Sequence, residues 1–234
     1  MTALFNEIFY RPILNLLVFL YDILPSNDLG LAIIGVTLVI RLILYPSFAS
    51  SMKHQKAIQE IQPKINQVRQ QHKDDRQKQT EAILKIYQEH KVSPFSSCLP
   101  ILIQLPVIFA LFLVLNNQLV KSTLEGIYGF IKNPGSLDPI AFGFLDLSKA
   151  NIPLAILAAG LQYIQSKMMQ SQSTATDPMA KAMQTQMLYV FPVLTLIIAW
   201  TLPSGLPLYW SVSTLFAIAQ QWFIIRQQNR KSVS

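Results

Sequence analysis

The chain has 234 residues, of which 51% are hydrophobic and only 13% are charged, and its mean hydropathy is +0.35. Soluble domains carry about 25% charged residues, so the composition excludes an ordinary water-soluble domain and indicates that lipid is the solvent. The net charge of +7 lies mostly in the segments between the apolar stretches, and the single cysteine excludes an internal disulfide framework.

The amino-terminal segment, residues 1–28, is apolar but interrupted by polar side chains. Residues 5–24 contain Arg11, Pro12 and Asp22. We therefore predict an amphipathic helix that lies in the membrane interface. A sixth membrane span, starting from an amino terminus inside the cell, is the alternative.

Five further segments are apolar over about 20 residues, the length that a helix needs to cross a bilayer. They are residues 29–52, 93–118, 150–166, 183–202 and 206–225. The third is short and would require a locally thinner bilayer. The predicted fold class is an all-α membrane protein, a five-span helical bundle with a cytoplasmic helical hairpin and an N-terminal amphipathic interfacial helix.

Lys and Arg residues are distributed unequally between the spans. Residues 53–92, 167–182 and 226–234 contain nine, two and three of them, against one, three and none in residues 1–28, 119–149 and 203–205. Basic residues are retained on the cytoplasmic side of the membrane. We therefore predict a multi-pass protein of the plasma (inner) membrane with a basic cytoplasmic tail at 226–234, a cytoplasmic loop at 167–182 and an extracytoplasmic segment at 119–149.

Residues 53–92 are polar, with two short sets of apolar side chains at helical spacing. The sets are Ile58, Ile61, Ile65 and Val68, then Ile83, Ile86 and Tyr87. With the polar residues 73–76 between them, they predict a helical hairpin with a narrow apolar seam. A solvated connector between two spans is the alternative. The exposed Lys and Gln side chains of a hairpin would offer a docking surface for acidic or nucleic-acid partners.

Arg41 stands near the middle of the first long span. An arginine at the bilayer centre costs about 2.5–3.5 kcal/mol on insertion scales. To reach bulk water by snorkelling, its side chain would have to cover about 16 Å at 1.5 Å per residue. None of the five spans contains Asp or Glu, so no carboxylate within the spans can neutralise the charge.

The guanidinium of Arg41 must therefore face water, backbone carbonyls, neutral polar side chains or a group that arrives from outside. Thr37 lies one turn earlier on the same helix face, and Gln104 and Gln162 lie in other spans. Each glutamine alone is equally well explained by a hydrogen bond between helices. Together these residues predict a hydrated polar cavity in which the positive charge attracts a passing carboxylate.

The spans offer little for catalysis. They contain no histidine and no acidic residue, so neither a serine-protease relay nor an aspartyl pair can form at membrane depth. His54, His72 and His90 are too widely spaced to suggest a metal site. We expect no enzyme activity, no cofactor and no metal.

Four motifs occur in chain order: the run around Arg41, residues 98–106 (CLPILIQLP), residues 176–179 (TDPM) and residues 203–210 (PSGLPLYW). Together they resemble the motifs of YidC/Oxa/Alb-type membrane protein insertases, and specifically of bacterial YidC without a large extracytoplasmic domain. The similarity covers nearly the whole chain from Leu29 to the tail. It implies a bundle around a hydrophilic groove that is open to the cytoplasm and to lipid but closed outside.

The resemblance also implies functional roles for particular residues. Arg41 would be the groove arginine, and Thr37, Gln162 and Trp210 would line the groove or its lipid-facing side. Hydrophobic substrate segments would slide along the third and fifth spans, where Gln162, Tyr209 and Trp210 lie.

The activity that the resemblance implies is that of an insertase and chaperone. It would move hydrophobic segments of nascent or newly made proteins through the groove into the lipid bilayer without nucleotide hydrolysis, and would take no small-molecule substrate. The ribosome and the Sec translocon are candidate partners of the hairpin at 53–92. A small transporter or channel is an alternative, although the chain shows neither repeated halves nor acidic coupling residues. A structural scaffold is another, and it leaves Arg41 unexplained.

Overall fold

Helices form most of the computed structural model, which describes residues 3–90, 92, 99–119, 126–170, 182 and 185–231. The first three helical segments are α1 (Ala3–Phe5), the π-helical η1 (Asn6–Tyr10) and α2 (Arg11–Ile23), followed by the 3-10 turn η2 (Pro25–Asn27). The others are α3 (Leu29–Ile43), α4 (Tyr45–Gln71), α5 (Arg76–Glu89), α6 (Leu99–Leu119), α7 (Ile152–Gln170), the π-helical η4 (Gln186–Val190), α9 (Phe191–Thr201) and α10 (Gly205–Lys231).

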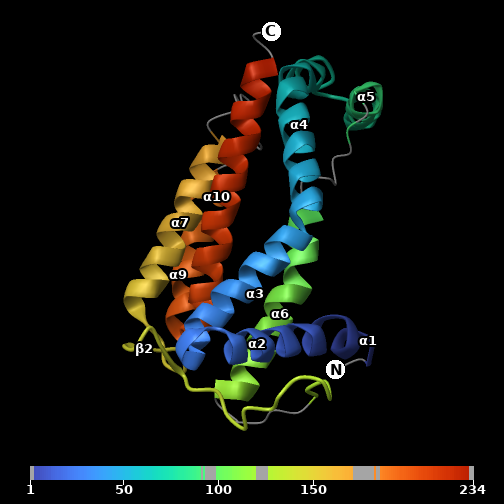
Figure 1. Ribbon diagram of the computed structural model, residues 1–234. Coiled ribbons are helices and arrows are strands. Elements are labelled where there is room, and N and C mark those ends of the chain that lie inside the picture. The colour runs from blue at the N-terminus through green and yellow to red at the C-terminus, as the bar shows by residue number, and fades with distance from the viewer. Residues whose placement is uncertain are drawn as a thin grey trace.

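The long helices run lengthwise through an elongated molecule, and α2 lies across them near one end (Figure 1). Helix α10 packs against α3 and α7, and α7 packs against α9. The α4–α5 pair and the carboxyl terminus lie at one end, whereas α1, α2 and the segment before α7 lie at the other. The predicted cytoplasmic hairpin and tail therefore share one end of the bundle.

The predicted span at 29–52 is not one straight helix. Helix α3 ends at Ile43, α4 begins at Tyr45, and the two axes are bent by 58°. Pro46, in the first turn of α4, has no N–H with which to continue the hydrogen bonding of α3. Arg41 consequently lies in the last turn of α3, where a positive charge is favourable next to the free carbonyls.

Two helical stretches in the described part of the chain are long and apolar enough to cross a membrane: Ala3–Ile23 and Gly205–Arg226. If the bent helix pair Leu29–Ile43 and Tyr45–Ile58 is counted as one span, it is a third candidate. Shorter apolar helices cover Leu102–Asn117 and Gln186–Thr201. Helix α7, which holds the predicted span at 150–166, is not among these candidates. Parts of the predicted segments at 93–118, 119–149, 167–182, 183–202 and 226–234 lie outside the described residues. The count of five spans stays a prediction.

Helices α4 and α5 pack together along the predicted seam. Ile61, Ile65 and Val92 are buried there, with Ala57, Ile58, Ile83, Ile86 and Tyr87 packed against them. Of the seven predicted seam residues, only Val68 is outside this cluster. Asp75 begins α5 by accepting a hydrogen bond from the backbone N–H of Lys78 at 3.0 Å. Helices α4 and α5 thus form a packed helical pair.

The main apolar core joins α2, α3, α6 and the start of α10. Leu14, Leu17, Ile33, Leu111 and Val114 are fully buried in it. Side chains on the other side of the amino-terminal helices are apolar too, since Leu4, Ile8, Phe19 and Ile23 are exposed. Contiguous exposed apolar side chains of this kind mark a surface that contacts lipid or protein.

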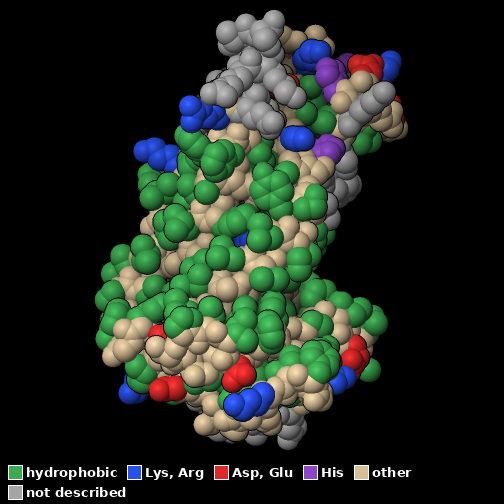
Figure 2. All heavy atoms as spheres, in the orientation of Figure 1, with side chains coloured by type: hydrophobic (Ala, Val, Ile, Leu, Met, Phe, Trp, Pro, Cys, Tyr) green, Lys and Arg blue, Asp and Glu red, His purple; other side chains and the backbone are tan. Residues whose placement is uncertain are grey.

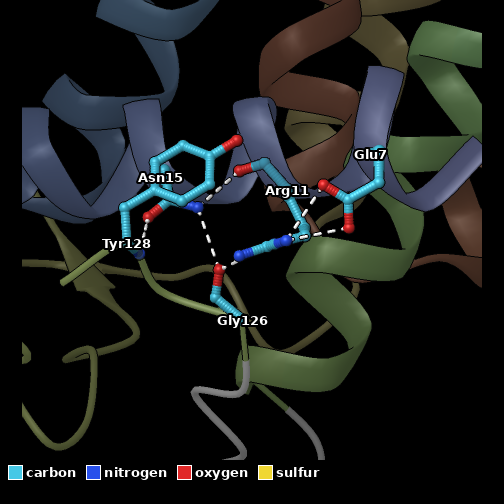
Figure 3. Close-up of polar contacts among 5 residues, drawn as sticks. All are labelled: Glu7, Arg11, Asn15, Gly126 and Tyr128. Carbon is cyan, nitrogen blue, oxygen red and sulfur yellow. Dashed lines mark hydrogen bonds and ion pairs between the residues drawn. The ribbon is translucent and has the colours of Figure 1, made fainter.

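Polar contacts fasten α2 to the segment that follows α6 (Figure 3). Asn15 is 2% exposed; its Nδ2 donates to the carbonyl oxygen of Gly126 at 3.1 Å, and its Oδ1 accepts from the backbone N–H of Tyr128 at 2.6 Å. Arg11 donates to both carboxylate oxygens of Glu7 and stacks on the Tyr128 ring, with Cζ 5.1 Å from the ring centroid. Asn15 therefore links two segments that are far apart in the sequence.

Replacing Asn15 with alanine should lower the free energy of unfolding by about 1–3 kcal/mol, because it removes the part-buried hydrogen bonds of Asn15 to the Gly126 carbonyl and the Tyr128 N–H. Thermal unfolding of the purified protein in detergent would measure the loss. Asn133→Ala is the matched control, since Asn133 is exposed and bonds only to the nearby Gly135 N–H. Equal stability of the two variants would contradict this role for Asn15.

A short hairpin precedes α7. Strands β1 (Ile140–Ala141) and β2 (Leu145–Asp146) pair antiparallel. The Asp146 carboxylate accepts from the Lys149 ammonium at 2.8 Å and from Ser148, and these contacts lower the pKa of Asp146 to about 2. Ser204 Oγ, just before α10, donates to the Asp146 carbonyl at 2.9 Å. The hairpin is therefore bonded to the turn between α9 and α10.

Candidate functional site

Arg41 is the centre of a polar cluster between α3, α4 and α10. Its side chain is 9% exposed, and Nε donates to Ser213 Oγ at 2.8 Å, with a second bond from Nη2 to the same oxygen. The guanidinium also lies over the Phe48 ring, with Cζ 4.8 Å from the ring centroid. No described carboxylate forms an ion pair with Arg41, in line with the acid-free spans.

Ser213 does not satisfy the whole guanidinium. Arginine has five N–H donors, and Ser213 accepts two of them. The Nη1 nitrogen of Arg41 has no hydrogen-bond partner among the described residues. The residue keeps 9% of its surface exposed, so it is not completely sealed from its surroundings.

Tyr209 extends the cluster toward α6. It precedes Ser213 by one helical turn, is 1% exposed and lies close enough to interact electrostatically with Arg41. Gln104 of α6 donates from Nε2 to the Tyr209 hydroxyl. A continuous line of polar side chains therefore runs from α6 through α10 to α3.

The structure brings together three of the six predicted site residues: Arg41, Tyr209 and Gln104. Thr37 is on α3 as expected, but its hydroxyl donates to the Ile33 carbonyl of its own helix at 2.6 Å. This leaves it less polar than a free hydroxyl. Gln162 on α7 and Trp210 on α10 are half-buried, and no contact joins either of them to Arg41 in the described part of the chain.

Ser213, Phe48 and Gln220 belong to the site although the sequence analysis did not single them out. Gln220 Nε2 donates to the Tyr45 carbonyl at 3.2 Å, beside the break between α3 and α4. Tyr209, Ser213 and Gln220 follow one another at four and seven residues, which places them on one helix face. The sequence could have indicated Ser213 and Gln220 through this spacing from Tyr209. No sequence pattern indicated Phe48, because its contact with Arg41 depends on the bend before α4.

Side-chain types are sorted along the molecule as in a membrane protein. Hydrophobic side chains cover the middle of the face shown in Figure 2, while most charged side chains gather at the two ends, apart from a small recessed basic spot at mid-height. No group of three or more His, Cys, Asp or Glu residues that could hold a metal ion occurs in the described ranges.

Comparison with known proteins identifies the family. A sequence profile described as "60Kd inner membrane protein" matches residues 19–231, which include every residue of the polar cluster. The chain belongs to the 60Kd inner membrane protein family. Its mostly helical fold with apolar spans agrees with membership in this family of inner membrane proteins.

Two similar proteins from different organisms carry the same name. A protein of Fusobacterium nucleatum subsp. nucleatum named membrane protein insertase YidC is 33% identical over 201 residues, covering 86% of this chain and 88% of the relative. One of the same name from Actinobacillus pleuropneumoniae serotype 3 is 35% identical over 223 residues, covering 95% of this chain but 38% of the relative. This chain therefore spans most of the first relative and well under half of the second.

A solved structure of an active YidC insertase, with its first transmembrane domain resolved, has a similar fold. The TM-score is 0.62 at 29% sequence identity, and the match covers 92% of this chain and 45% of the other. The fold of this family member therefore corresponds to slightly less than half of that longer protein.

Proposed function

We propose that this chain is a membrane protein insertase that transfers hydrophobic segments of newly made proteins into the bilayer without nucleotide hydrolysis. The observation that carries the proposal is the guanidinium of Arg41, which is buried among apolar helices without a described carboxylate partner and donates two hydrogen bonds to the neutral Ser213. The relatives named insertase support the same activity.

The polar cluster provides the mechanism. The polar flank of a substrate enters a hydrated groove beside Arg41, which shortens the apolar distance that the flank has to cross. The guanidinium holds carboxylate or carbonyl groups of the flank briefly, and such contacts are stronger here than in water because the surroundings are less polar. The apolar part of the substrate then moves sideways into lipid, where burial of apolar surface supplies the driving force.

The proposed placement in the membrane is a five-span bundle with the α4–α5 hairpin and the carboxyl terminus in the cytoplasm. Helix α2 lies across the long helices (Figure 1), which supports an interfacial position for residues 1–28. The contacts of Asn15 with the 126–128 segment, and of the β1–β2 hairpin with Ser204, support a groove closed at that end. The ribosome and the Sec translocon are proposed partners of residues 53–92.

Crosslinking tests the proposed substrate path. With a photoreactive amino acid in place of Trp210, a ribosome-bound nascent chain carrying one hydrophobic segment should crosslink efficiently. Trp200 of α9 is the matched control, because it is a half-exposed tryptophan on a helix outside the proposed path. A position 210 that crosslinks no better than position 200 would contradict the path along α10.

A further inference from the structure

The hairpin before α7 holds an aromatic side chain away from the protein. Phe144 is 82% exposed, and its neighbour in the tip, Phe142, is 36% exposed. The two rings lie 6.4 Å apart at a tilt of 40°. Exposed apolar side chains that lie together, as these two rings do, mark a surface that contacts lipid or protein.

Hydrogen bonds and packing fix the backbone conformation of the hairpin tip. Phe142 has a φ of +54°, a conformation that a bulky residue rarely adopts. Its backbone N–H donates to the Asp28 carboxylate at 2.5 Å, and its ring lies against Gly30, where an added Cβ would come within 2.7 Å of Phe142 Cζ. The Phe144 N–H donates to the Ala141 carbonyl at 3.1 Å. The fold therefore holds the backbone in the shape that directs Phe144 outward.

The position of the hairpin matches the edge of a lipid-facing surface. It lies beside the beginning of α7 (Figure 1), where Ile152, Ile156 and Leu157 are exposed. Lys149, between the hairpin and α7, has a side chain that is 79% exposed. Interfacial segments place Phe, Trp or Leu on their apolar side and Lys or Arg on their polar side, at the boundary between acyl chains and headgroups.

We propose that the β1–β2 hairpin is a membrane anchor that inserts Phe144 into the lipid interface and fixes the depth of this end of the bundle. Lipid fits better than a protein partner, because a Phe side chain buries only about 150–250 Å². A stable protein interface requires about 1,200–2,000 Å² in total. The anchor goes beyond the insertase activity and does not depend on it.

The test places an environment-sensitive fluorophore at position 144 of the full chain. Cys98→Ser removes the native thiol, Phe144→Cys carries the fluorophore, and the protein is reconstituted in phosphatidylcholine–phosphatidylglycerol vesicles. Lipids with a nitroxide close to the headgroup should quench position 144 several-fold more than Ser136→Cys, a matched exposed position in the same segment. Dilution of the protein in lipid should leave this quenching unchanged.

Two results would overturn the anchor. Quenching at position 144 that equals quenching at position 136 would show that the hairpin tip does not enter the lipid interface. Quenching at position 144 that rises on dilution would show that a second copy of the chain, rather than lipid, covers the ring. Neither readout involves insertion of a substrate. If the anchor fails this test, the insertase proposal is unaffected. If the insertase proposal fails its own tests, the anchor proposal is unaffected.

Discussion

Arg41→Glu is expected to reduce insertion of a single-span substrate with an acidic outer tail by about tenfold or more. At an effective dielectric constant of about 20, unit charges about 4 Å apart attract by about 4 kcal/mol, and the substitution turns this attraction into repulsion. Insertion would be measured in vesicles as the protease-protected fraction of the substrate over time.

Two controls separate the charge of Arg41 from its packing. Arg41→Lys retains the positive charge and should keep most of the activity, whereas Arg41→Gln should lose activity to an intermediate extent. A substrate with a neutral tail should be affected less by all three variants. Full insertion of the acidic-tailed substrate by a folded Arg41→Glu protein would contradict the attraction of substrate carboxylates.

Ser213→Ala is expected to lower the free energy of unfolding by about 1.5–3 kcal/mol, since Ser213 Oγ accepts two bonds from a charged group. Insertion should also slow, because the guanidinium loses the contact that orients it. Reversible unfolding in mixed micelles gives the free energy, and the vesicle assay gives the rate.

Ser211→Ala is the matched control for Ser213→Ala. Ser211 lies on the same helix and is also buried, but its hydroxyl donates to the Pro207 carbonyl of its own helix at 2.8 Å. Its removal should cost about 1 kcal/mol or less. If the two alanine variants were equally stable and equally active, Ser213 would have no special role in holding Arg41.

Part of the candidate site could be predicted because charged and amide side chains are energetically unfavourable inside apolar helices and therefore stand out in the sequence. Arg41 was identifiable from its place in the first long span, and the absence of acidic residues predicted that only neutral groups would surround it. The bonds to Ser213 and the ring of Phe48 agree with that prediction. Gln104 was predicted from the same reasoning, and it reaches Tyr209.

Contacts between helices could not be predicted, because they depend on how each helix is rotated and where it bends. Residues 29–52 were predicted as one span, and the sequence did not show that a bend would place Arg41 in the last turn of α3. Thr37 was expected to be polar lining, and this stays a prediction; its hydroxyl donates to the Ile33 carbonyl of its own helix. Gln162 has no described contact with Arg41, since α7 packs on α9 and α10 rather than beside the end of α3.

Water contact of the Arg41 guanidinium in a bilayer is the central claim, and water-edited solid-state NMR measures it directly. The protein would carry ¹⁵N-arginine in lipid bilayers, with Arg41→Lys used to assign the side-chain signals. We expect magnetisation from water to reach the Arg41 side-chain nitrogens nearly as fast as those of the exposed Arg76. With leucine also ¹⁵N-labelled in the same protein, transfer as slow as that to the backbone amide of the fully buried Leu111 would show that the guanidinium is dry, and would contradict the proposed mechanism.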